Sequence, residues 1–99
     1  MSELSNARKK IEDIDEKMAV LFQARMSCVE DIADYKKRNS IPVLDTAREK
    51  ELIERNEQYI GTEGLKPYYR QFIRAVMDIS RQYQHDLLKE NEIIKENGK

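Results

Sequence analysis

The sequence has 99 residues, of which 39% are hydrophobic and 37% charged, and its formal net charge is −1. A chain of this length forms one domain with a small core, and the balanced charge argues against a general nucleic-acid binder, which carries a basic excess. One cysteine excludes an intrachain disulfide, and one histidine argues against a Cys/His zinc site.

Apolar residues recur every three or four positions from Glu3 to Arg38, and the series is broken only at position 25. They are Leu4, Ala7, Ile11, Ile14, Met18, Leu21, Cys28 and Ile32. Because no Gly or Pro interrupts it, this spacing predicts one helix over residues 3–38, about 50 Å long. A compact chain of this size would be only about 25–30 Å across. The helix must therefore project and pack against something else, most simply a second copy.

Pro42 favours a break after the first helix, since it disfavours helical geometry at the preceding residue. Asp45 is a candidate N-cap for a second helix over residues 46–59, which the glycines at 61 and 64 would end. A third helix is predicted over residues 66–92, with Pro67 in its first turn. The sequence therefore predicts an all-α fold in a single domain over residues 1–99, with three helices, one of them very long.

Two cations interrupt or extend the apolar stripe of the first helix. Arg25 occupies a stripe position, and Lys36 lies on the same face about 16 Å further along the axis. A buried arginine needs an anion or a carboxylate partner, which a ligand or a register-setting acid would supply. Arg8 lies about 25 Å from Arg25 along the axis, so the two cannot hold one small molecule within one chain. Across an antiparallel pair of such helices they could.

Polar residues also fall on the inner faces of the other two helices. Glu49 leads the apolar series of the second helix, so its side chain should point inward. Ser80 and Gln84 are one turn apart on the third helix, among apolar neighbours. Asp45 has the simpler interpretation of a cap, and Arg48 that of a surface charge. Together these residues predict a polar pocket with cations, a carboxylate, a hydroxyl and an amide.

An ordered set of short motifs runs along nearly the whole chain. It consists of Ala7-Arg8-Lys9-Lys10-Ile11, Ile14-Asp15-Glu16-Lys17, Ala24-Arg25, Lys36, Pro42-Val43, Asp45, Arg48-Glu49, Ser80 and Gln84. With these spacings the chain resembles the small, all-helical class of chorismate mutases, the type II family. The I-x-x-I-D-E opening is moderately specific, and the whole ordered set is highly specific.

The resemblance implies an intertwined six-helix homodimer that converts chorismate to prephenate in aromatic amino acid biosynthesis, without a cofactor or a metal. It implies that Arg25 and the partner subunit's Arg8 hold the two substrate carboxylates. Lys36 would bind a carboxylate and the ether oxygen, and Gln84 would complete the contact to that oxygen. Glu49 would accept a hydrogen bond from the ring hydroxyl.

The same resemblance implies that Arg48, Asp45 and Ser80 complete the substrate pocket, with Arg48 near a carboxylate. An isochorismate–pyruvate lyase of the same fold is the nearest alternative, and the Arg48-Glu49 pair with Gln84 favours the mutase. A non-enzymatic helical-bundle protein would explain Arg25 but not the other inward polar residues. No apolar run is long enough for a signal peptide or a membrane span, so the cytoplasm is the expected compartment.

Overall fold

The computed structural model describes residues 2–97, and the side chains of residues 2–89. It contains the long helix α1 (Glu3–Arg38), the shorter helix α2 (Thr46–Glu57), a short 3₁₀ helix η1 (Glu63–Leu65) and the helix α3 (Lys66–Asn97). Residues 2–97 include no strand, which confirms the all-helical class and the three main helices. Over the same residues no helix combines the length and the apolar composition needed to cross a membrane.

Both ends of α1 are stabilised locally. The Ser2 hydroxyl accepts a hydrogen bond from the Ser5 amide at 3.0 Å, and Glu3 lies in the first turn, at the positive end of the helix dipole. The last turn carries three basic residues, which lie at the negative end. The observed helix has the range that its apolar spacing predicts.

The chain leaves α1 through a Schellman turn. The Ile41 amide donates to the Lys36 carbonyl at 2.8 Å, and the Ser40 amide donates to the Lys37 carbonyl at 3.3 Å. Ser40 has a φ of 54°, a left-handed conformation that glycine usually occupies at this point of a helix end. The turn brings the next residues back against α1, where the Val43 side chain is buried.

Replacing Ser40 with glycine should raise the free energy of unfolding by about 0.5–1 kcal/mol, because glycine adopts a positive φ without a steric cost. Urea denaturation of the purified protein measures the change. Ser40→Ala is the control: it removes the same hydroxyl but keeps the strained backbone, so it should give no gain. A glycine variant no more stable than the alanine variant would contradict strain at this position.

Two helix ends differ from those that the sequence predicts. α2 ends at Glu57 rather than 59, because the amides of residues 58–60 donate to carbonyls three residues earlier, at 3.0–3.3 Å. This tighter 3₁₀ spacing stops the helix before the glycines are reached. α3 continues to Asn97 rather than 92. No Gly or Pro occurs between Pro67 and Gly98, so nothing in the sequence breaks it earlier.

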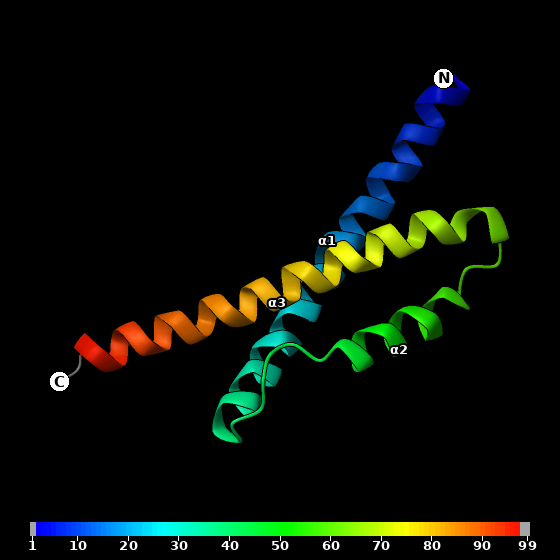
Figure 1. The fold of residues 1–99 in the computed structure, drawn as a ribbon. Helices are drawn as coiled ribbons and strands as arrows, with labels where there is room; N and C mark the ends of the chain where they lie inside the picture. The colour runs from blue at the N-terminus through cyan, green and yellow to red at the C-terminus, as the bar shows by residue number, and fades with distance from the viewer. Residues whose placement is uncertain (1, 98–99) are drawn as a thin grey trace.

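The three helices make an open arrangement rather than a compact bundle. α1 crosses α3, and α2 lies beside the first half of α3 (Figure 1). The chain extends over 63 × 31 × 15 Å, with a radius of gyration of 17.9 Å. A compact chain of about 100 residues would have a radius near 13 Å. The N-terminal half of α1 projects beyond the crossing, as the predicted helix length requires.

The buried core is correspondingly small. Its hydrophobic members are Val29, Ala33, Val43, Ile73 and Met77. They come from α1, from the segment after it and from α3, so the core lies where these elements meet. α2 contributes no fully buried residue.

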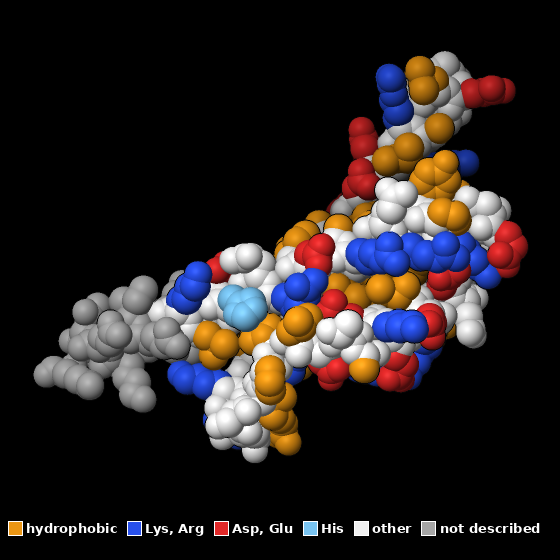
Figure 2. All heavy atoms as spheres, in the orientation of Figure 1, with side chains coloured by type: hydrophobic (Ala, Val, Ile, Leu, Met, Phe, Trp, Pro, Cys, Tyr) orange, Lys and Arg blue, Asp and Glu red, His pale blue; other side chains and the backbone are white. Residues whose placement is uncertain are grey.

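Most of the apolar stripe on α1 is exposed in the single chain. Leu4, Ile11 and Ile14 each keep more than half of their surface accessible, and Leu21 keeps 67%. Cys28, another stripe position, is also exposed. Apolar side chains are visible along the projecting arm in Figure 2. An extended apolar face of this kind marks an interaction surface, because isolated soluble proteins rarely leave one uncovered.

A bidentate ion pair between Glu57 and Arg70 joins the end of α2 to the start of α3. Arg70 donates from Nε to Glu57 Oε2 at 2.8 Å and from Nη2 to Glu57 Oε1 at 2.6 Å. Hydrogen bonding from Arg70 lowers the pKa of Glu57 below its ordinary value of 4.5, and the charges of Arg70 and Lys66 add to this effect against desolvation. The bidentate geometry fixes the direction in which the chain returns from α2.

This pair should make folding stability depend on acid pH. Because the pKa of Glu57 is lowered in the folded state, its stabilising effect is complete above the ordinary value of 4.5 and is lost as the pH falls through the folded-state pKa. The unfolding free energy of the wild type should therefore exceed that of Glu57→Gln at pH 7, and the two should converge in acid. Urea denaturation between pH 3 and pH 7 tests this, and a constant difference over that range would contradict it.

Candidate functional site

The crossing of α1 and α3 brings Arg25 against Ser80. The Arg25 Nη1 atom donates to the Ser80 hydroxyl oxygen, and that hydroxyl donates in turn to the Val76 carbonyl at 2.8 Å. Arg25 is half-buried, and Ser80 is 6% exposed. Within the described part of the chain Arg25 has no carboxylate partner. The register-setting acid that would explain Arg25 structurally is therefore not found in one chain, and the guanidinium meets a neutral group.

Lys36 lies at the other end of the same helix face, just before the Schellman turn. Its Nζ atom donates to the Val43 carbonyl at 2.9 Å, a contact that exists because the turn folds Val43 back onto α1. The side chain is half-buried. An ammonium group has three donors, so the contact to Val43 aims the group and leaves two donors for a ligand.

Gln84 lies one turn beyond Ser80 on α3 and is 6% exposed, so both polar residues face inward as predicted. The Gln84 Oε1 atom is buried and has no hydrogen-bond partner among the described residues. Leaving such an atom unpaired costs about 1–3 kcal/mol. A polar ligand that hydrogen-bonds this amide would recover that cost, which makes the region a candidate binding site.

The start of α2 places three further predicted residues. Asp45 is its N-cap: Oδ1 accepts from the Arg48 amide at 3.0 Å. The Arg48 side chain lies in solvent, 3.5 Å from Glu51. Glu49 is half-buried and faces α3, where its Oε2 lies 2.8 Å from Arg81 Nε. The structural interpretation of Asp45 is thus confirmed, and Glu49 points inward as predicted.

Arg8 is not brought to these residues. It is exposed on the projecting arm of α1, in a shallow hollow lined only by residues of its own helix start. Arg25 lies about 25 Å away along the axis. One chain therefore brings Arg25, Ser80 and Gln84 together where α1 meets α3, places Lys36 further along the same face of α1, and leaves Arg8 outside.

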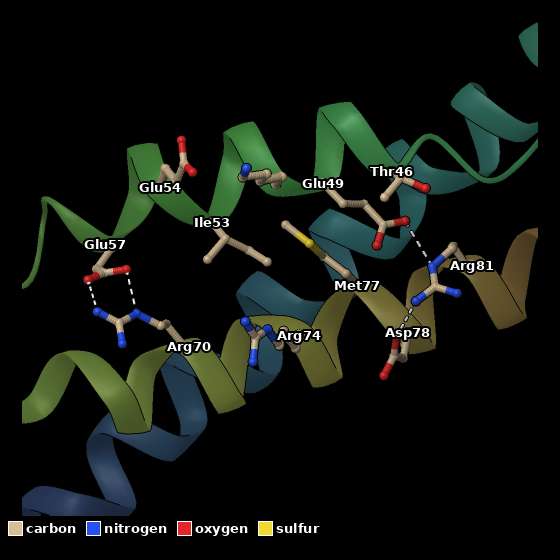
Figure 3. A pocket seen from close by; sticks show the side chains of 11 residues that line it. Thr46, Glu49, Ile53, Glu54, Glu57, Arg70, Arg74, Met77, Asp78 and Arg81 are labelled. Atoms are coloured by element: carbon tan, nitrogen blue, oxygen red, sulfur yellow. Dashed lines mark hydrogen bonds and ion pairs between the residues drawn. The ribbon is translucent and has the colours of Figure 1, made fainter.

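Arg81 was not among the residues singled out from the sequence. It lines a hollow of about 490 Å³ between α2 and α3. Figure 3 shows Glu49 and Arg81 directed toward one another at one end of this hollow, and Glu57 and Arg70 at the other. The sequence spacing could have indicated this place for Arg81. Positions 70, 74, 77 and 81 recur every three or four residues and so share a face of α3.

The charges at the crossing favour an anionic ligand. Arg25 and Lys36 are half-buried cations whose partners are a hydroxyl and a backbone carbonyl, so neither charge is neutralised in the described structure. Arginine recognises carboxylates by parallel hydrogen bonds, and lysine supplies a compact charge. The α3 face that bears Ser80 also carries the Gln84 amide with its unpaired oxygen, and the α2–α3 hollow adds the Glu49 carboxylate. This set can hold a small polyanion that also carries a hydroxyl.

Comparison with known proteins finds a matching family and a similar protein. Residues 7–85 match the family model for chorismate mutase type II, a range that includes every predicted site residue from Arg8 to Gln84. The chain is also similar to the chorismate mutase of Methanocaldococcus jannaschii, with 38% identity over 55 residues. That match covers 56% of this chain and 56% of the relative, so the chain spans about half of the relative's length. No solved structure matches the chain.

Proposed function

The chain belongs to the type II chorismate mutase family, and from this we propose that it catalyses the rearrangement of chorismate to prephenate. The observation that carries the proposal is the cluster at the α1–α3 crossing. Arg25 meets only a hydroxyl there, near the unpaired amide oxygen of Gln84, and Lys36 meets only a backbone carbonyl further along α1. Chorismate is a dianion with an ether oxygen and a ring hydroxyl, and these groups correspond to the residues present.

The reaction is a unimolecular pericyclic rearrangement, in which the ether C–O bond breaks while a C–C bond forms. No nucleophile or proton transfer is needed, so the protein must hold the compact reactive conformer and stabilise negative charge on the ether oxygen. We assign Arg25 to one substrate carboxylate. Lys36 and Gln84 are assigned to the ether oxygen, where their hydrogen bonds strengthen as the C–O bond breaks.

The residues of α2 complete the pocket in this proposal. Glu49 accepts a hydrogen bond from the ring hydroxyl. Arg48 turns from its exposed contact with Glu51 toward a substrate carboxylate, at little cost, because exposed ion pairs contribute about 0–1 kcal/mol. Asp45 acts by capping α2 and so fixing the position of both neighbours. Ser80 holds the Arg25 guanidinium.

We propose further that the active form is an intertwined six-helix homodimer. The support is the exposed apolar stripe of α1, together with an apolar groove of about 490 Å³ beside the crossing. The groove is lined by Met18, Leu21, Phe22, Arg25, Phe72, Ile73, Ala75, Val76 and Ile79. A second copy packed antiparallel along this face would cover both, and would bring the partner subunit's Arg8 to the second substrate carboxylate. As the family resemblance implies, we place the reaction in aromatic amino acid biosynthesis in the cytoplasm.

A substrate assay with two compounds tests the activity. Purified protein should deplete chorismate and form prephenate, and should release no pyruvate from isochorismate at a comparable rate. Pyruvate from isochorismate without prephenate from chorismate would instead identify a lyase. If the protein converts neither compound, the result would favour a non-enzymatic helical interaction protein. Sedimentation of the same sample should give a dimer, and an active monomer would contradict the shared site.

A further inference from the structure

Arg81 contacts Glu49, whose carboxylate is the one that we propose binds the substrate directly. Its Nε atom lies 2.8 Å from Glu49 Oε2, and the two side chains keep 32% and 24% of their surface accessible. The Nε–H bond does not point along this contact, so it is an ion pair rather than a linear hydrogen bond. The same guanidinium also pairs through Nη2 with Asp78 Oδ1 (Figure 3).

We infer that Arg81 is a positioning residue, which fixes the Glu49 carboxylate so that its second oxygen can accept the substrate's ring hydroxyl. This inference rests on the proposed function. Arg81 Nε contacts Glu49 Oε2, and we assign the other oxygen, Oε1, to the substrate hydroxyl. A free glutamate samples several rotamers, and fixing one oxygen restricts the position of the other. Asp78 in turn restrains the guanidinium from its own helix.

The Arg81–Glu49 ion pair also affects how α2 is positioned against the pocket residues of α3. Arg81 follows Ser80 directly and lies one turn before Gln84, so its ion pair ties α2 to the part of α3 that carries both residues. α2 has no fully buried residue to anchor it. The position of Glu49 relative to α3 therefore depends in part on polar contacts between the two helices, beside the half-buried Leu52 and Ile53.

The second ion pair between these helices provides a matched control. Arg70 binds Glu57 near the opposite end of α2, about 12 Å along the helix from Glu49. Removing either arginine breaks one link between α2 and α3. Only the removal of Arg81 releases a carboxylate assigned to the substrate.

Arg81→Met should lower kcat/KM for chorismate about 10- to 100-fold, because a misplaced binding group costs rate even when the fold is kept. Arg81→Lys, which retains a cation at this position, should recover part of the loss. Arg70→Met should leave kcat/KM within about twofold of the wild type while lowering the melting temperature, which circular dichroism measures for all variants. If Arg70→Met and Arg81→Met lower kcat/KM equally, the effect is structural and the inference is wrong.

A double-mutant cycle then asks whether Arg81 acts through Glu49. In a Glu49→Gln background, Arg81→Met should change kcat/KM by less than about twofold, since the group that it positions is already altered. If the two losses multiply instead, Arg81 acts by another route and the inference is overturned. Failure of the proposed function is seen separately, as a wild-type protein that does not convert chorismate. An active wild type with a fully active Arg81→Met variant would overturn only the role of Arg81.

Discussion

Lys36→Ala should lower kcat for chorismate about 100- to 1,000-fold, the loss expected when one donor to a developing negative charge is removed. The structure aims the Lys36 ammonium by its 2.9 Å contact to the Val43 carbonyl and leaves its other donors available. Losing that contact should cost only about 0.5–1.5 kcal/mol of stability, so the helices remain folded. Stopped-flow or steady-state assays of chorismate depletion, together with a thermal melt, separate the two effects.

The neighbouring residue offers the control for this variant. Lys37 lies on the same final turn of α1 and is exposed, and its side chain has no assigned role. Lys37→Ala should keep kcat within about twofold of the wild type. Gln84→Ala should act in the same direction as Lys36→Ala, because its buried amide is assigned to the same ether oxygen. Near-normal turnover in Lys36→Ala would rule out the assigned mechanism.

The shared site predicts that two inactive variants restore activity when they are mixed. Arg8→Ala and Arg25→Ala should each lose most activity, since each removes one carboxylate contact. In a heterodimer, one site would combine the intact Arg25 of one chain with the intact Arg8 of the other. After unfolding and refolding a 1:1 mixture, half of the dimers are mixed and each has one intact site. Activity should therefore return to about one quarter of the wild-type value, by the symmetry of a two-site dimer.

A second mixture serves as the control for this experiment. Arg25 and Lys36 are assigned to the same chain's contribution to a site, so mixing Arg25→Ala with Lys36→Ala leaves no intact site in any dimer. Refolding that mixture should restore nothing. Equal recovery in both mixtures, or recovery in neither, would contradict the assignment of Arg8 to the partner's site.

Much of the fold could be predicted from helical spacing because the sequence has few interruptions. The range of α1 follows from an unbroken apolar period, and Asp45 caps α2 as its position suggests. The inward direction of Ser80 and Gln84 also follows from their apolar neighbours on α3. The end of α2 could not be predicted, because the 3₁₀ turn after Glu57 leaves no mark in the residue pattern.

The side-chain partners between helices could not be predicted from the sequence. The sequence indicates that Glu49 points inward, but its partner depends on how α2 is rotated against α3. Arg81 and Arg74 share a face of α3, and only the packed structure shows that Arg81 is the one paired with Glu49. For the same reason Arg25 was expected to meet an acid or an anion, whereas within one chain it meets the Ser80 hydroxyl.

The absence of any fully buried residue in α2 has a consequence for the dynamics of the pocket. Segments with little burial open locally at a lower free energy than the whole fold, so we expect α2 to open as a cooperative unit of its own in native-state hydrogen exchange. Opening α2 would carry Glu49 away while Arg25 and Ser80 stayed together at the α1–α3 crossing. The α2 contacts to the substrate, from Glu49 and Arg48, and the Arg25 contact on α1 would then have separate lifetimes. Screening of ion pairs by salt would shorten the lifetime of the α2 contacts more than that of the Arg25 contact.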